Sequence, residues 1–206
     1  MVIILFAVAV GYIYISVRSN HLQHDQNKSF QIYASLKLVF WVFHLIIIFF
    51  GFCLTYQFNQ KQKSFTGFQM SMLFSVMGYV ISFIFSVTAL AKFHQYLFIL
   101  EKTCNLLEVV FQALFLFRVT SLDFKKSKNL YPTKFRISLW IVLFIGFSNM
   151  IIWGVDSFYE VDHFSVITPF ETKFYTKEVW DKFVHAIYPV ILFFRFNSGS
   201  SLFCIF

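Results

Sequence analysis

The sequence predicts an all-α fold: a polytopic membrane helical bundle with about six transmembrane helices in a single transmembrane domain, residues 1–206. Three observations lead to this prediction. The chain is 58% hydrophobic and only 13% charged, whereas soluble domains average about 25% charged residues. Phenylalanine alone contributes 32 residues, and so few charges cannot cover the surface of a soluble domain. Apolar runs long enough to cross a bilayer recur along the chain.

Each predicted span is close to the roughly 20 apolar residues that a helix needs to cross the hydrocarbon core. The first, third and fifth spans contain no Asp, Glu, Lys or Arg. The first also has the length of a signal peptide, but it lacks a positive segment before the apolar stretch and a clear cleavage site. The six predicted spans are Met1–Val17, Leu38–Tyr56, Phe68–Leu90, Tyr96–Phe117, Ile137–Gly154 and Val179–Phe196.

The charges between the spans predict the orientation. The segment 118–136 carries six basic residues and one acidic residue, whereas the segment 155–182 carries six acidic residues and three basic ones. Basic loops stay on the cytoplasmic side of a membrane. We therefore expect the 118–136 loop and both termini in the cytoplasm, and the 155–178 loop outside.

Several classes of function are disfavoured. The net charge of +7 suits membrane orientation better than a nucleic-acid partner, because the chain lacks a solvent-facing basic surface. Three scattered cysteines provide neither a disulfide framework nor a CxxC metal site, so we expect no metal and no cofactor. Nucleotide-binding, zinc-protease and serine-hydrolase motifs are absent. His44, Cys53 and Cys104 form no nucleophile–base pattern, and we expect no enzyme.

A polar stripe runs along the fourth predicted span. Its members follow one another at steps of four, three and four residues, which places them on one face of a helix. Such a stripe predicts a hydrated path with carboxylates that exchange protons. The alternative places Glu101 at the headgroups beside Lys102 and uses Gln112 only for helix packing. The stripe consists of Glu101, Asn105, Glu108 and Gln112.

Other polar residues lie in the remaining spans. Asn149 interrupts an apolar run, and His185 titrates near physiological pH. Arg195 lies near the predicted inner end of its span, where its side chain would extend to the headgroups. Small residues also recur on one face of the third span, which predicts close helix packing. They are Ser71, Ser75, Gly78, Ser82 and Ser86.

Four blocks of the sequence resemble the otopetrin family, with agreement in order and spacing. Phe111–Phe115 (FQALF) resembles a Gln-x-x-Phe block, and Ser148–Phe158 (SNMIIWGVDSF) resembles an Asn followed by an aromatic-flanked Asp-Ser-Phe. Pro189–Ser198 (PVILFFRFNS) is similar to a block that ends in Phe-Tyr-Arg-Phe-His-Ser, and Leu202–Phe206 (LFCIF) to Leu-Phe-Glu-Ile-Trp.

The resemblance implies a proton-selective channel with twelve membrane helices, built from two six-helix halves and assembled as a dimer. This chain is similar to the C-terminal half. Gln112 and Asn149 match the first two members of a Gln–Asn–Tyr triad of that half, and Phe194 occupies the tyrosine position. We expect a plasma-membrane channel or half-channel whose partners are lipid, protons and a second copy or half. The expected proton pathway comprises Gln112, Asn149, Glu108, Phe194, Glu101 and His185.

Two other interpretations remain open at this stage. The chain supplies half of the family architecture, which also fits a non-conducting fragment or an accessory subunit. A small multi-pass transporter or chemoreceptor would use the same polar stripe to bind a ligand. An outside N-terminus is typical of a receptor, and the loop charges oppose it.

Overall fold

The computed structural model describes residues 26–58, 67–123, 128–160 and 169–203. Four of its helices contain segments long and apolar enough to cross a membrane: 34–55, 67–92, 96–120 and 132–158. The all-α membrane bundle is thereby confirmed, and the predicted span Met1–Val17 lies outside the described residues. The elements are α2 (Gln26–Thr55), α3 (Gly67–Lys92), α4 (Tyr96–Thr120), α6 (Pro132–Val155), the π-helical η1 (Asp156–Glu160), α8 (Pro169–Tyr175) and α9 (Lys177–Phe203).

Local sequence explains several helix boundaries. Pro132 occupies the first turn of α6, where its missing N–H costs no hydrogen bond. Between α3 and α4, His94 adopts a positive φ of 56°, and between α8 and α9, Thr176 adopts a φ of 67°. A residue in this left-handed region cannot continue a right-handed helix. These two positions therefore turn the chain sharply from one helix into the next.

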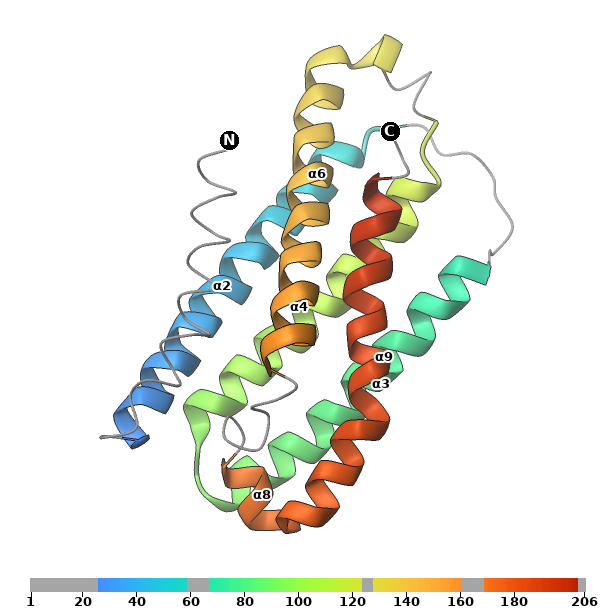
Figure 1. The fold of residues 1–206 in the computed structure, drawn as a ribbon. Helices are drawn as coiled ribbons and strands as arrows, with labels where there is room; N and C mark the ends of the chain where they lie inside the picture. The colour runs from blue at the N-terminus through green and yellow to red at the C-terminus, as the bar shows by residue number, and fades with distance from the viewer. Residues whose placement is uncertain (1–25, 59–66, 124–127, 161–168, 204–206) are drawn as a thin grey trace.

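The five long helices close into a ring. α2 packs against α4 and α6, α3 packs against α4 and α9, and α6 packs against α9 (Figure 1). One end of the bundle holds α8 and the α3–α4 connection, and we call it the α8 end. α2, α4 and α9 finish at the opposite end, where α6 begins. Every long helix therefore has one face toward the ring interior and another toward its surroundings.

The outward faces are apolar, as a lipid environment requires. Phe74, Phe49 and Ile46 are all more than half exposed. Inside the ring, the half away from α8 is filled by apolar side chains, including Phe115, Leu116 and Ile145. The small-residue face of α3 packs closely, because a Cβ on Gly78 would lie only 2.8 Å from Cγ1 of Val190 in α9.

The helices extend beyond the predicted spans. α2 begins at Gln26 rather than Leu38, and α9 continues to Phe203 rather than ending at Phe196. The segment 155–178, predicted as a loop, contains η1 and α8. Hydropathy marks only the part of a helix that is uniformly apolar, so polar helical turns are missed at both ends. The longer α9 has an important effect on Arg195, since it places this residue two turns before the end.

Candidate functional site

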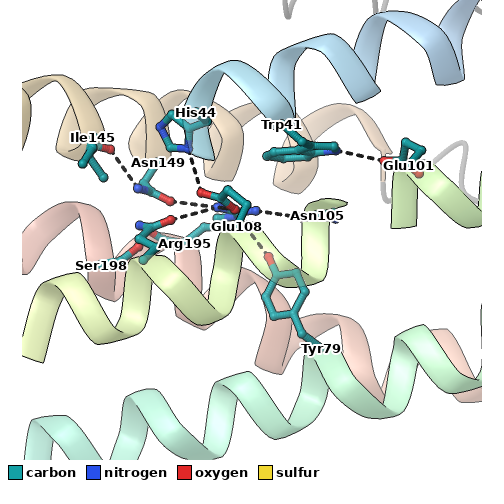
Figure 2. A network of polar contacts seen from close by, with 11 residues as sticks. Trp41, His44, Tyr79, Glu101, Asn105, Glu108, Ile145, Asn149, Arg195 and Ser198 are labelled. Atoms are coloured by element: carbon teal, nitrogen blue, oxygen red, sulfur yellow. Dashed lines mark hydrogen bonds and ion pairs between the residues drawn. The ribbon is translucent and has the colours of Figure 1, made fainter. Parts of the chain in front are cut away.

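The guanidinium group of Arg195 lies at the centre of the ring interior. The side chain is 1% exposed although it carries a full charge. Its Nη1 lies 2.9 Å from Oε2 of Glu108 in α4. Figure 2 shows side chains from α3, α4 and α6 pointing toward it. Arg195 donates hydrogen bonds to Tyr79 Oη (3.0 Å), Gln112 Oε1 (3.2 Å), Asn149 Oδ1 (3.2 Å) and Asn105 Oδ1 (3.1 Å).

The polar stripe of α4 supplies most of these partners. Glu108 and Gln112 are completely buried, and Glu101 is 3% exposed. The helical spacing that predicted a common face thus directs the stripe into the ring. An arginine is always charged and presents its donors in a planar fork, so it needs several acceptors at once. Carboxylate and amide oxygens at successive turns of one helix meet this need.

A histidine of α2 extends the network on the other side of Glu108. Nδ1 of His44 lies 2.7 Å from Oε1 of Glu108, and both side chains are fully buried. The imidazole ring stacks on Phe40 at 5.7 Å and lies 6.0 Å from the ring of Phe144 in α6. Glu108 therefore bridges α2 and α9 through its two carboxylate oxygens.

Trp41 connects the network with Glu101. Its Nε1 donates to Oε1 of Glu101 at 2.9 Å, and its ring centroid lies 5.0 Å from Cζ of Arg195. The other carboxylate oxygen of Glu101 lies 3.4 Å from Nζ of Lys102. A cation over an indole face is favourable, so Trp41 contacts an acidic group with its edge and a basic group with its face.

A cavity of about 90 Å³ reaches the network from the α8 side. Buried polar cavities of this size hold a few ordered waters. Four of its lining residues, Lys37, Glu101, Lys102 and Asp156, carry charges of both signs, and Arg195 is a fifth charged residue in the lining. The lining includes Lys37, Trp41, Tyr79, Glu101, Lys102, Asn105, Asp156 and Arg195.

Beyond Arg195 the interior becomes apolar. Phe194 is fully buried, and its ring meets that of Tyr79 edge to face at 5.6 Å. Phe115, Leu116 and Ile145 are equally buried in the same core. The polar cavity and the apolar half of the ring therefore meet at the level of the guanidinium group.

The two amides expected in the proton pathway, Gln112 and Asn149, both bind Arg195. Their side-chain oxygens accept from Nη1 of Arg195. Nδ2 of Asn149 donates to the Ile145 carbonyl at 2.8 Å. Nε2 of Gln112 has no hydrogen-bond partner within the described residues. The two amides thus converge on the guanidinium group.

The prediction that Arg195 extends to the headgroups is wrong. It assumed that the last span ends near residue 196, whereas α9 continues to Phe203 and Arg195 is buried. Glu101, which the alternative placed at the headgroups beside Lys102, turns its carboxylate into the bundle against Trp41. His185 is exposed on α9, and the structure does not bring it to the other expected pathway residues.

Three members of the network had no assigned role in the sequence analysis: Trp41, His44 and Tyr79. His44 is the only Asp, Glu, Lys, Arg or His in its predicted span, which was an available signal. Tyr79 lies next to Gly78 in the small-residue pattern, and nothing local distinguishes it from other aromatic residues. Among the described residues, no group of three or more His, Cys, Asp or Glu is arranged to hold a metal ion.

The helix α8 covers the ring at the α8 end. Its Tyr175 donates to the Phe85 carbonyl of α3 at 3.0 Å and stacks on Trp180 of α9 at 5.8 Å. Glu171 of α8 is 2% exposed. Burial raises the pKa of Glu171 above its ordinary value, and the positive charge of Lys102 opposes this rise. The ring is therefore closed at this end in part by a carboxyl group that is more easily protonated than an ordinary glutamate.

Comparison with known proteins agrees with this geometry. The family model for otopetrin matches residues 1–196. No curated protein and no solved structure matches the chain. The matched residues include α2 to α8, and α9 up to the residue after Arg195. The chain therefore belongs to the otopetrin family, a family of membrane channels rather than enzymes, and is a multi-pass membrane protein.

Proposed function

We propose that this protein conducts protons selectively across the plasma membrane through the interior of the helix ring. The observation that supports this proposal is the buried network of Arg195, Glu108 and His44 in a member of a channel family. Ionisable side chains within a membrane bundle are costly and usually mark pathways for ions or protons. Following the loop charges, we propose that both termini lie in the cytoplasm and that the cavity opens to the outside.

Selectivity for protons follows from the size and charge of the path. The cavity of about 90 Å³ ends at Arg195, whose charge is balanced by Glu108. Such a narrow, neutral constriction holds back hydrated Na⁺ and K⁺ ions. Protons do not have to pass it as hydrated ions, because they transfer along hydrogen bonds between waters and titratable groups.

The described arrangement corresponds to a closed channel in this proposal. Nη1 of Arg195 donates hydrogen bonds to the side-chain oxygens of Gln112 and Asn149. Apolar side chains fill the next layer of the ring interior. Movement of the guanidinium group away from the amides would free both oxygens for water. Glu101 would then serve the entry side of the path, Glu108 the centre, and Phe194 the boundary with the apolar layer.

Electrical recording tests the proposal. Acid-evoked currents from cells that express the chain should reverse at the proton equilibrium potential, with no shift when Na⁺ or K⁺ is exchanged. Gln112→Leu and Asn149→Leu should each reduce the current by at least tenfold at equal surface expression. The exposed His185 provides a matched control, and His185→Gln should leave the current unchanged. If both leucine variants carry the same current as the unchanged chain, these amides are excluded from the proton pathway.

We further propose that the conducting form contains a second six-helix unit, either another copy or a complementary half. The resemblance to one half of the otopetrin architecture supports this. Purified chain in liposomes should conduct with a steep dependence on the protein-to-lipid ratio, and cross-linking should yield dimers. Proton flux that rises linearly with the amount of protein from the most dilute liposomes would show that a single chain is sufficient, and no flux at any ratio would overturn the proposed function.

A further inference from the structure

We infer that His44 is a proton-exchanging residue of the pathway and that its Nε2 is the atom that takes up the proton. This inference rests on the proposed function and deepens it, because it assigns the step to a side chain of α2. The stripe of α4 alone had suggested that the carboxylates carry this chemistry.

The orientation of the His44 ring is fixed on both faces and at one nitrogen. Phe40 stacks on the imidazole, and Phe144 packs against it at a tilt of 49°. Nδ1 lies 2.7 Å from Oε1 of Glu108. An ionised carboxylate only accepts hydrogen bonds, so Nδ1 carries the hydrogen and Nε2 presents its lone pair in the neutral ring.

Nε2 of His44 is buried and has no hydrogen-bond partner within the part of the chain that the structure describes. Buried polar atoms are almost always paired with protein or water, and each exception requires an explanation. The buried polar atoms without a hydrogen-bond partner in this part of the chain also include Oγ of Ser148 and Nε2 of Gln112. Ser148 lies one turn along α6 from Phe144, and Gln112 lies one turn along α4 from Glu108. A water that paired with Nε2 of His44 would be placed to deliver a proton to it.

The charged and titratable groups near His44 come from α2, α3, α4 and α9. From α4, Glu108 faces the ring directly and Glu101 lies two turns away. From α9, Arg195 pairs with Glu108, and Tyr79 of α3 accepts from Arg195. Lys37 lies two turns back on α2 itself. The sequence of α6 from 137 to 155 contains no titratable residue.

The proton balance is simple in this arrangement. Glu108 and Arg195 cancel in charge while His44 is neutral. A hydronium ion gives its proton to Nε2 and leaves as neutral water, which makes the imidazole a cation held by Glu108. The same proton returns from Nε2 to water, or Nδ1 releases its hydrogen to Oε1 of Glu108. An imidazolium also competes with Arg195 for Glu108, so uptake weakens the contact that holds Arg195 on the amides.

Two measurements on the full chain in liposomes test the inference. Solid-state NMR of ¹⁵N-histidine-labelled protein should show the His44 signal, assigned as the one lost in His44→Gln, converting from the neutral to the cationic form as the pH is lowered. The proton flux of His44→Gln should fall at least tenfold, with a flattened pH dependence. Glutamine retains a donor toward Glu108, and His185→Gln serves as the matched control.

The outcomes separate the inference from the proposed function. A His44 ring that stays neutral while the flux of the unchanged chain varies with pH would overturn the inference. So would His44→Gln channels with the original flux and pH profile. Absence of proton flux from the unchanged chain under every condition would instead overturn the proposed function. Should His44→Gln fail to fold, the His44 signal is assigned by sequential backbone correlations and the titration of the unchanged chain decides.

Discussion

Nη1 of Arg195 in α9 lies 2.9 Å from Oε2 of Glu108 in α4, and neither side chain reaches the surface of the bundle. The pair joins two helices that face each other across the ring. A buried ion pair adds little net stability relative to apolar side chains, because both charges lose their hydration. Removal of only one partner is different, since it leaves the other charge buried and unpaired.

We expect Glu108→Leu to lower the free energy of unfolding by about 3–5 kcal/mol. The double variant Glu108→Leu with Arg195→Met should be more stable than the sum of the two single changes predicts. Unfolding of the purified protein in detergent, followed by tryptophan fluorescence, measures all three variants. The exposed pair Lys182–Glu178 provides the control, and Glu178→Gln should have no measurable effect. Strict additivity of the two core substitutions would contradict the assigned pairing.

Phe194→Tyr tests the position at which this chain departs from the family triad. The ring is 0% exposed and packs against Tyr79, so a new hydroxyl group needs a buried partner. Without one, we expect a loss of about 1–3 kcal/mol in the free energy of unfolding. Phe193→Tyr is the control, because this neighbour is 46% exposed and should tolerate the change. Unaltered stability of Phe194→Tyr would mean that the hydroxyl finds an acceptor in the network.

Gly78→Ala tests the contact between α3 and α9. The added Cβ would approach Cγ1 of Val190 to 2.8 Å and its Cβ to 3.3 Å, and a β-branched side chain adapts poorly. We expect a loss of about 1–3 kcal/mol in the free energy of unfolding, as for overpacked cores. Gly67→Ala, with no atom within 4 Å of the added Cβ, should be neutral or slightly stabilising. Adding Val190→Ala to Gly78→Ala should restore the free energy of unfolding. Failure of this rescue would show that the strain does not arise at the contact with Val190.

The closure of the ring by α8 should depend on pH. Burial raises the pKa of Glu171, so the docked helix favours the neutral carboxyl group. Docking is therefore strongest in acid and weakens as the pH rises through the raised pKa. Hydrogen exchange of the α8 amides, corrected for intrinsic rates, should show more protection at pH 5 than at pH 8. Glu171→Gln should remove this difference, and the control Glu178→Gln should retain it. Equal protection of the α8 amides at pH 5 and pH 8 in the unchanged chain would refute the coupling between protonation of Glu171 and docking of α8.

The sequence predicted those features of the fold and site that depend on local spacing. Apolar runs identified the helices, and the steps between Glu101, Asn105, Glu108 and Gln112 gave the face that points inward. A period of 3.6 residues is a property of one helix, so it can be read without a partner. Asn149 was noticeable as the amide that interrupts the apolar run of its span, and the resemblance to a family grouped it with Gln112.

The other members of the network depend on contacts between helices. Trp41, His44 and Tyr79 lie on α2 and α3, and their approach to Glu101, Glu108 and Arg195 follows from the order of helices around the ring. No local period encodes that order. Arg195 was misplaced for a different reason: the predicted span ended at the first polar residues after it. The helix continues because those residues lie inside a folded bundle, not in lipid.

The burial of Arg195 also has a consequence for biogenesis. α9 is absent from the helices apolar enough to cross a membrane on their own, and an arginine in the middle of a helix costs about 2.5–3.5 kcal/mol during translocon-mediated insertion. α9 leaves the ribosome after α4, whose Glu108 is by then available as a counter-ion. Insertion of α9 into the bilayer should therefore depend on the helices that precede it. In nascent chains that lack Glu108, α9 should remain exposed to cellular quality control.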